Sequence, residues 1–243
     1  MMVVMIASDW QDHHGIRLPR TLVPGGDAER ATILLRAYFA PLSGKNTGYT
    51  GGQWDRFDPS GTRETSANVF TPDDLLSASL LSTPIPGRAA MDLLTDADGA
   101  FAAGLAAIGA DRDFADLENL DEAPFAAARS LYRLVKELPG VGETRATKLL
   151  ARKRPHLIPI VDRVLKQTIF FGQRHQWAPL HAALVAEDRA LHRTLLDLHR
   201  AAGLSEQVAP VRVLDVLAWL EGSGNAQRVL ARQEIHEEPV EGE

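Results

Sequence analysis

The chain has no cysteine among its 243 residues, which excludes disulfides, thiolate metal sites and iron–sulfur clusters. It also has no apolar run long enough to cross a membrane. The opening MMVVMIASDW is apolar only briefly and lacks a basic start, so it does not predict a secretory signal. We therefore expect a soluble cytoplasmic protein without a membrane partner.

Positive charge is scarce as well, since 26 Lys and Arg stand against 32 Asp and Glu, for a net charge of -6. This balance argues against a protein that wraps nucleic acid along its whole surface. One segment departs from it: residues 138–175 hold eight basic and two acidic residues, a local charge of +6. The sequence predicts a local footprint on nucleic acid, although basic runs often mark no more than a solvated face.

Apolar residues recur at helical spacing over most of the chain, which predicts an all-α fold. We expect helices at 27–40, 72–82, 86–95, 97–109, 121–137, 143–153, 160–171, 178–202 and 210–221. The length and composition allow two helical lobes, which we place at residues 1–120 and 121–232. The glutamate-rich residues 233–243 predict a disordered tail.

The segment from Leu138 to Asp162 reads LPGVGETRATKLLARKRPHLIPIVD and predicts a helix–hairpin–helix. Pro139 and Gly140 end the first helix, and Gly142 lets the chain turn back into the second. The backbone N–H groups of Gly140, Val141 and Gly142 then form a nest that accepts a phosphate oxygen without reading bases. A structural turn without such a role is the alternative interpretation of these glycines.

A single carboxylate follows the hairpin at Asp162, at the entry of the helix expected over 160–171. The positive end of that helix favours the ionised acid. The alternative is that Asp162 is only a helix cap, the commonest role of aspartate at such a position.

These residues resemble the helix–hairpin–helix (HhH-GPD) DNA glycosylase superfamily, whose members carry LPGVG-x-[K/S]-TA and a later VDxHV. In this sequence Thr144 stands at the position of the family's catalytic lysine, Ala146 matches the alanine, and Asp162 follows 18 residues after Thr144. The detailed match covers about 30 residues. The segment RKRPHLIPIVDRV also resembles an uncharacterised actinobacterial family of unknown function.

The resemblance implies a two-lobed glycosylase-like fold with Asp162 as the catalytic acid, stabilising positive charge on the sugar as the base leaves or activating water. It also implies hairpin contacts to the DNA backbone, which we extend to Thr144, Arg145 and Lys148. Thr144 cannot form the Schiff base of a lyase, so we expect a monofunctional enzyme. The VDxHV histidine is missing, because Val164 and Leu165 follow Arg163.

Residues 43–70 break the helical pattern and predict an irregular loop or small hairpin inserted between helices. Their aromatic residues Tyr49, Trp54 and Phe57 are candidates for stacking on a flipped base, although Trp54 and Phe57 can equally anchor the loop to the core. Polar side chains that can reach a base edge accompany them: Asn46, Gln53, Asp55, Arg63, Glu64 and Asn68.

The eight histidines show no ligand spacing typical of zinc, and we expect no metal site and no cofactor. His13 and His14 are adjacent, so both cannot face one metal from a helix.

Three functions follow from this sequence. The first is a monomeric DNA glycosylase acting on double-stranded DNA, which flips a damaged or modified base and leaves an abasic site in repair or in defence against modified phage DNA. The second is a non-catalytic helix–hairpin–helix DNA-binding protein. The third is an enzyme of the same fold that acts on a modified pyrimidine nucleotide.

Overall fold

A computed structural model describes residues 10–42 and 48–237, with side chains placed up to residue 232. The described chain is mostly helical, as the periodicity predicts, and carries one small antiparallel sheet. It divides into two compact units. We call residues 39–163 and 205–212 the central unit, and residues 1–38, 164–204 and 213–243 the terminal unit.

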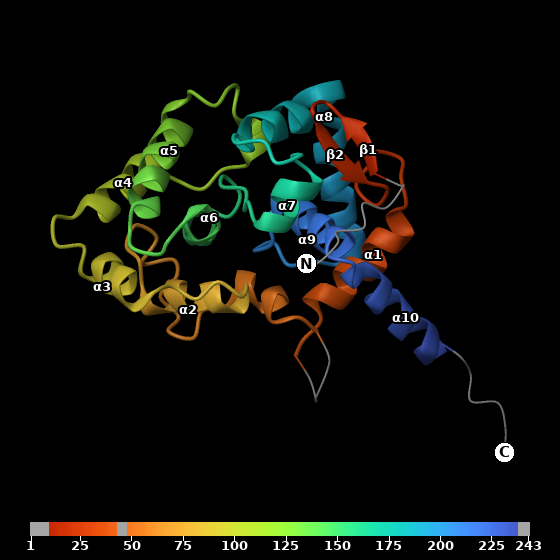
Figure 1. Ribbon diagram of the computed structural model, residues 1–243, viewed down its shortest axis with the longest axis horizontal. Helices are drawn as coiled ribbons and strands as arrows, with labels where there is room; N and C mark the ends of the chain where they lie inside the picture. Colours follow the sequence, from red (N-terminus) through yellow and green to blue (C-terminus); the bar gives the residue numbers. More distant parts are fainter. Residues whose placement is uncertain (1–9, 43–47, 238–243) are drawn as a thin grey trace, which may run out of the picture. The chain divides into compact units, whose positions relative to one another are not determined.

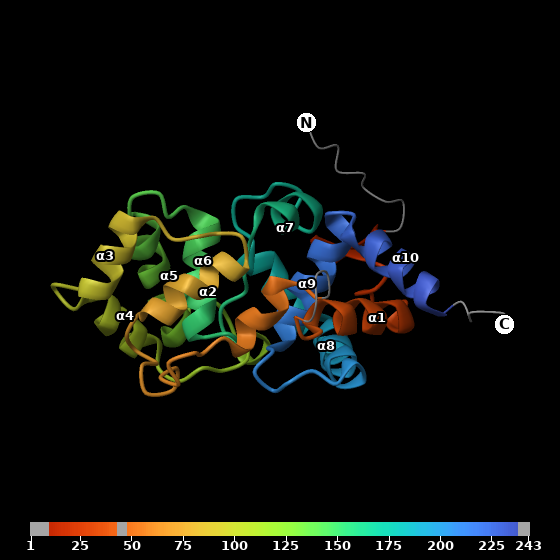
Figure 2. The same ribbon diagram turned by 90° about the horizontal axis from the view of Figure 1, so that it is seen from below.

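The central unit is built around α6 (Glu143–Lys153), which Figure 1 shows nearly end-on between α5 (Ala123–Lys136) and α2 (Pro72–Leu80). Figure 2 shows the unit from below, with α2 crossing α6 rather than running parallel to it. α4 (Ala100–Ile108) packs on α5, and the 3₁₀ helix η1 (Thr50–Arg56) packs on α2. α3 (Gly87–Thr95) and the short η2 (Phe114–Asp116) complete the unit.

The terminal unit begins with a hairpin of β1 (Trp10–His13) and β2 (Ile16–Pro19), which packs on α8 (Trp177–Ala202). Its other helices are α1 (Ala28–Phe39), α7 (Arg163–Thr168), most of α9 (Pro210–Gly222), and α10 (Asn225–Glu237). Leucines dominate its core, including Leu18, Leu34, Leu184, Leu195 and Leu217, each with no exposed surface.

Helix boundaries follow the capping signals in the sequence. α2 begins after Thr71, whose side chain accepts from the N–H of Asp74 while the Asp74 carboxylate accepts from the N–H of Thr71. Pro72 at the first helical position fits this capping box. α6 spans the residues expected for it, from the carboxylate Glu143 to Lys153.

Several expectations about the elements were wrong. The β1–β2 hairpin was not expected, and α10 carries helix to Glu237, into the segment expected as a disordered tail. α7 is shorter than the helix expected over 160–171. The unit boundaries also differ from a single boundary near residue 120, because the central unit holds 39–163. Of the two expectations for residues 43–70, the described residues 48–70 fit the irregular loop, with turns and η1, and not the small hairpin; Asn46 lies outside the described residues.

α8 is not one continuous helix. Ala186 has φ −64° and ψ 158°, and the next three residues, Glu187, Asp188 and Arg189, have φ of 50°, 53° and 61°. Leucines on both sides of this break share one stripe, which is why the sequence predicted an unbroken helix. In the part of the chain that the structure describes, no helix meets the length and hydropathy needed to cross a bilayer.

Candidate nucleic-acid interface

The helix–hairpin–helix predicted from the sequence is present in the central unit. α5 ends at Lys136, and Val141 N–H donates to the Leu138 carbonyl at 3.0 Å to close the turn. Gly140 has φ +74°, and a Cβ there would lie 2.9 Å from Cγ of Pro86. Glycine is therefore needed at 140 for both conformation and space.

The second helix of the motif begins without a side-chain cap. Gly142 is the N-cap residue of α6, is exposed, and has φ −24° and ψ −177°. A Cβ at Gly142 would meet nothing within 4 Å. Because the first N–H groups of a helix lack partners within it, this open end can accept an anion. Glu143 in the first turn places a carboxylate near the same end, which opposes a phosphate there.

Arg145 stabilises the hairpin from within α6. Its Nε donates to the Pro84 carbonyl at 2.9 Å and its Nη1 to the Gly140 carbonyl at 3.1 Å. The side chain is half-buried, so the guanidinium lies at the surface beside the turn.

Fewer basic side chains of residues 138–175 lie at the surface than the charge count suggests. Lys148 is 6% exposed, and its Nζ donates to the Leu81 carbonyl at 2.9 Å. This position does not fit the phosphate contact that we expected of Lys148, because its ammonium is directed into the unit. Arg152, Lys153 and Arg154 are buried as well, so four of the eight basic side chains of residues 138–175 are buried.

The three consecutive cations hold the irregular segment instead. Arg152 donates from Nη1 to the Trp54 carbonyl at 2.9 Å and from Nη2 to the carbonyl of Phe57. Lys153 Nζ donates to the Ser66 carbonyl at 3.0 Å, and Arg154 Nη1 to the Ala67 carbonyl at 2.9 Å. Four backbone carbonyls of the irregular segment thus accept a hydrogen bond from a buried cation.

Asp74 on α2 neutralises part of this buried charge. One carboxylate oxygen lies 3.3 Å from Arg152 Nε, and the other lies 2.5 Å from Lys153 Nζ. Burial lowers the pKa of Lys153, and the charge of Asp74 opposes that shift. Asp74 itself is 2% exposed, so the pair is shielded from solvent on both sides.

Asp162 lies beside the same helix, immediately before α7 rather than inside its first turn. The Thr147 hydroxyl of α6 contacts both the carbonyl and the N–H of Val161, at 3.4 and 3.3 Å. Thr147 Oγ1 also lies 3.2 Å from the carbonyl of Thr144, one turn earlier on α6. Thr147 thus fixes the backbone before Asp162 against the helix that follows the hairpin. The Asp162 side chain is half-exposed.

The aromatic residues of the irregular segment do not form one surface. Trp54 is 1% exposed, with the Arg212 guanidinium 5.4 Å from its ring, so it anchors the segment and cannot stack on a base. The base-stacking role expected of Trp54 is therefore wrong, because the ring is enclosed. Tyr49 and Phe57 are half-buried. Asp55, a candidate for reading a base edge, is also enclosed at 1% exposed, and burial raises its pKa against the effect of Arg212.

A polar cavity of about 620 Å³ lies in the central unit. Arg63 and Glu64, two of the candidate polar residues of the irregular segment, line it together with Arg56 and Asp58. His156, which lies far from these residues in the sequence, also lines the cavity. Its Nδ1 is 2.8 Å from an Asp111 carboxylate oxygen. That hydrogen bond raises the pKa of His156. Asp162 is not among the lining residues.

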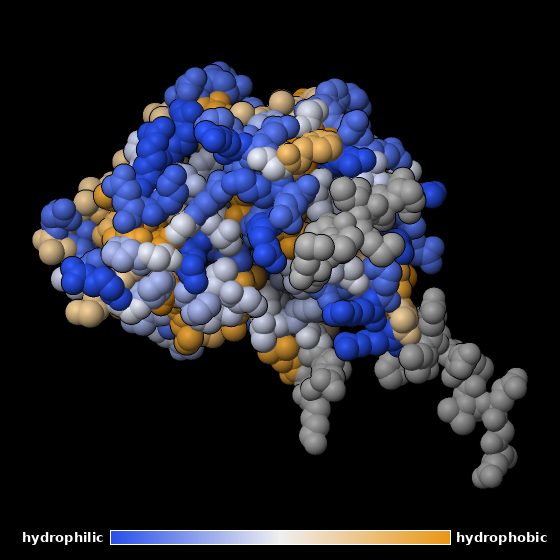
Figure 3. Space-filling model, in the orientation of Figure 1, coloured by the Kyte–Doolittle hydropathy of each residue, from blue (hydrophilic) through white to orange (hydrophobic). Residues whose placement is uncertain are grey.

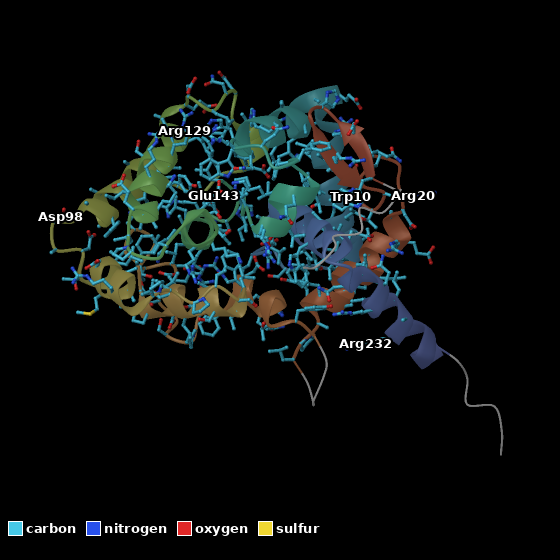
Figure 4. All side chains as sticks on the ribbon, in the orientation of Figure 1. Trp10, Arg20, Asp98, Arg129, Glu143 and Arg232 are labelled. Atoms are coloured by element: carbon cyan, nitrogen blue, oxygen red, sulfur yellow. The ribbon has the colours of Figure 1, made fainter. Side chains whose placement is uncertain are left out.

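Two further surface cations close to the hairpin in sequence are on α5, and we did not predict them. Arg133 and Lys136 lie in the last turn of α5 and are exposed. Lys136 Nζ lies 5.3 Å from the ring of Tyr132, whose pKa is raised to about 12 by burial and by Glu143. Hydrophilic side chains cover the visible face of α5 in Figure 3, and Figure 4 marks Glu143 where α6 begins beside it. The sequence signal that could have indicated these two cations is the pair of basic residues, three positions apart, just before LPGVG.

The chain belongs to the Family of unknown function (DUF6308), which matches residues 31–222. This range includes the hairpin, Asp162 and the cavity. No curated protein matches the chain, and no solved structure matches it.

Proposed function

We propose that this DUF6308 protein is a monofunctional DNA glycosylase, which hydrolyses the N-glycosidic bond of a flipped damaged or modified base and leaves an abasic site. One observation carries the proposal: the Thr147 hydroxyl ties the backbone next to Asp162 to α6, the helix that the open hairpin begins. A phosphate-binding turn and a carboxylate thus belong to one rigid element.

The hairpin supplies the grip on DNA in this proposal. The N–H groups of Gly140 and Gly142 approach a phosphate, because no side chain of Gly142 obstructs them. The N–H of Val141, which we also expected to take part, instead donates to the Leu138 carbonyl. Arg133 and Lys136 at the end of α5 add positive charge, and Arg145 adds more from α6. Lys148 has no part in this contact. Such a footprint is small, which agrees with the net charge of -6.

Asp162 supplies the chemistry. As the bond between C1′ and the base nitrogen breaks, its electron pair leaves with the base and positive charge develops on the sugar. An ionised Asp162 stabilises that charge, and a water molecule adds to C1′ while the proton it loses ends on the nitrogen of the released base. Thr144 lies where a lyase carries its lysine and cannot form a Schiff base, so the strand is not cleaved in the same step.

The test is a panel of duplexes that each carry one damaged or modified base, including the bulky modified bases found in phage DNA. The protein is incubated with each duplex, and abasic sites are revealed by cleavage in hot alkali. The proposal predicts alkali-dependent cleavage of at least one duplex and no cleavage without alkali. Salt-sensitive binding without abasic sites on any duplex would instead support a non-catalytic DNA-binding protein.

A second candidate function rests on the cavity of about 620 Å³, a volume in the range of small-molecule sites. Arg56 and Arg63 provide positive charge there, and Asp58 and Glu64 provide acceptors. This combination suits a modified nucleotide. Release of free base from nucleotides, with no activity on duplex DNA, would favour this function over the first.

A further inference from the structure

Two histidines and a glutamate meet in the terminal unit, away from the hairpin and from Asp162. His13 ends β1, His14 begins the turn to β2, and Glu187 lies at the break in α8. One ligand atom of each lies within 4.8 Å of the other two, and His14 Nε2 is 2.8 Å from a carboxylate oxygen of Glu187. Figure 1 shows the hairpin beside α8.

The hairpin turn explains how adjacent histidines share one side. Successive side chains of a strand point to opposite faces. His14 has left the strand, because His14 and Gly15 form a two-residue turn with φ of 46° and 87°. The two imidazole rings consequently meet edge to face with their centroids 4.8 Å apart. We expected that two adjacent histidines could not face one metal from a helix. His13 and His14 lie at a strand end and a turn rather than in a helix, so this restriction does not apply to them.

The break in α8 brings the third group to the cluster. Glu187, Asp188 and Arg189 all have positive φ, a conformation that is unfavourable for any residue with a side chain. Three such residues in succession interrupt a helix of 26 residues at the point where it faces the histidines. Strain of this kind is concentrated at functional sites. The exposed ion pair between His14 and Glu187 is too weak an interaction to account for it.

The ring of His13 has a nitrogen available to a metal. His13 Nε2 is buried and has no hydrogen-bond partner among the described residues, so its lone pair is available. A hydrogen bond with the Ala183 backbone engages the ring of His13, as is usual for histidines that bind metals.

We propose that His13, His14 and Glu187 form a binding site for one Zn²⁺ ion, with a fourth position open to water. Two imidazoles and one carboxylate are a donor set that zinc prefers. Bond lengths of about 2.0–2.1 Å in a tetrahedral site place the ligand atoms roughly 3.3 Å apart. His14 and Glu187 are exposed and can close from 4.8 Å to this separation by side-chain rotation. The ion then joins the hairpin to α8.

The experiment uses the full chain without an affinity tag, stripped with a chelator and titrated with ZnCl₂ in a calorimeter. We expect one Zn²⁺ per chain and an upward shift in Tm on binding. Co²⁺ in place of Zn²⁺ gives the visible absorption band of a four-coordinate site. An exposed histidine elsewhere in the terminal unit provides a control, so His175→Ala keeps the binding and His14→Ala loses it.

A pair of glycine variants separates loss of a ligand from loss of structure. Glu187→Gly removes the carboxylate and relieves a positive φ, so the metal-free protein stays folded while Zn²⁺ binding is lost. Asp188→Gly relieves the neighbouring positive φ in the same way and leaves all three ligands, so it binds like the parent. Equal Zn²⁺ binding by Glu187→Gly and Asp188→Gly would overturn the proposal. So would the absence of stoichiometric binding by the parent.

Discussion

Arg152, Lys153 and Arg154 show how far a residue's environment can depart from its type. All three charged side chains are buried. Each donates to backbone carbonyls rather than to solvent, and these carbonyls belong to residues 54–67 or to Gly109 at the end of α4. Their periodicity on α6 gave no sign of this, because the segments that enclose α6 are distant in sequence. A charge count therefore overestimated the basic surface.

Asp74 allows a direct test of that buried network. Asp74→Asn leaves Arg152 and Lys153 without their counter-charge, and we expect the free energy of unfolding to fall by about 3 kcal/mol. Urea denaturation followed by circular dichroism measures the change. Asp73→Asn is the matched control, because Asp73 is the half-buried neighbour that accepts from the Ser60 N–H at 3.0 Å. It should cost less than about 1 kcal/mol, and an equal loss in both variants would contradict the network.

The candidate site could be predicted in part at this scale. Gly140 was identified as a turn residue, and its φ of +74° confirms that interpretation. The burial of Lys148 and Trp54 was not predictable, because it depends on contacts with α2 and α9 residues far away in sequence. Arg133 and Lys136 were missed because the basic segment was counted only from residue 138.

At the scale of elements, the residues that begin and end helices were the reliable signal. Pro139 and Gly140 ended one helix, Thr71 and Pro72 began another, and both signals gave the boundaries seen in α5 and α2. Elements with weak local signals were missed. β1 and β2 have four residues each, and the break in α8 lies within a continuous leucine stripe.

The hairpin's role can be tested without disturbing its fold. Gly142→Ala adds a methyl group where nothing lies within 4 Å, so the free protein tolerates it while the group obstructs a phosphate at the α6 terminus. We expect at least about a tenfold loss in duplex affinity, measured by fluorescence anisotropy.

Gly87→Ala is the control for Gly142→Ala, because Gly87 is the first residue of α3 and a Cβ there also meets nothing within 4 Å. This variant should bind duplex DNA like the parent. If both variants bind alike, the backbone of the hairpin does not contact DNA.

At the scale of the whole molecule, the chain passes repeatedly between its two units. The central unit takes residues 39–163 and also 205–212, which places Arg212 with Asp55 at 3.4 Å. Hydrophobic periodicity gives helices but no information on which distant helices share a unit. The single boundary expected near residue 120 could not have anticipated this division.

The His156–Asp111 pair contributes to the stability of the molecule in a pH-dependent way. The hydrogen bond to Asp111 raises the pKa of His156 above its ordinary 6.5, despite burial. A raised pKa in the folded state means that the pair stabilises fully below 6.5 and loses this contribution as the pH rises through the raised value. His156→Gln should therefore cost more stability at pH well below 6.5 than well above it. Denaturation at both pH values measures the difference, and an equal or reversed cost would contradict the assignment.

The central claim is that Asp162 carries out base release while the hairpin binds the DNA. The most direct measurement compares the single-turnover rate of abasic-site formation by the parent and by Asp162→Asn, on a duplex that the parent cleaves. We expect unchanged duplex affinity and a rate lower by at least about 100-fold, since the neutral amide no longer stabilises charge on the sugar. Asp121→Asn, at an exposed carboxylate of the same unit, should retain the parent rate. Equal rates for the parent and Asp162→Asn would contradict the account.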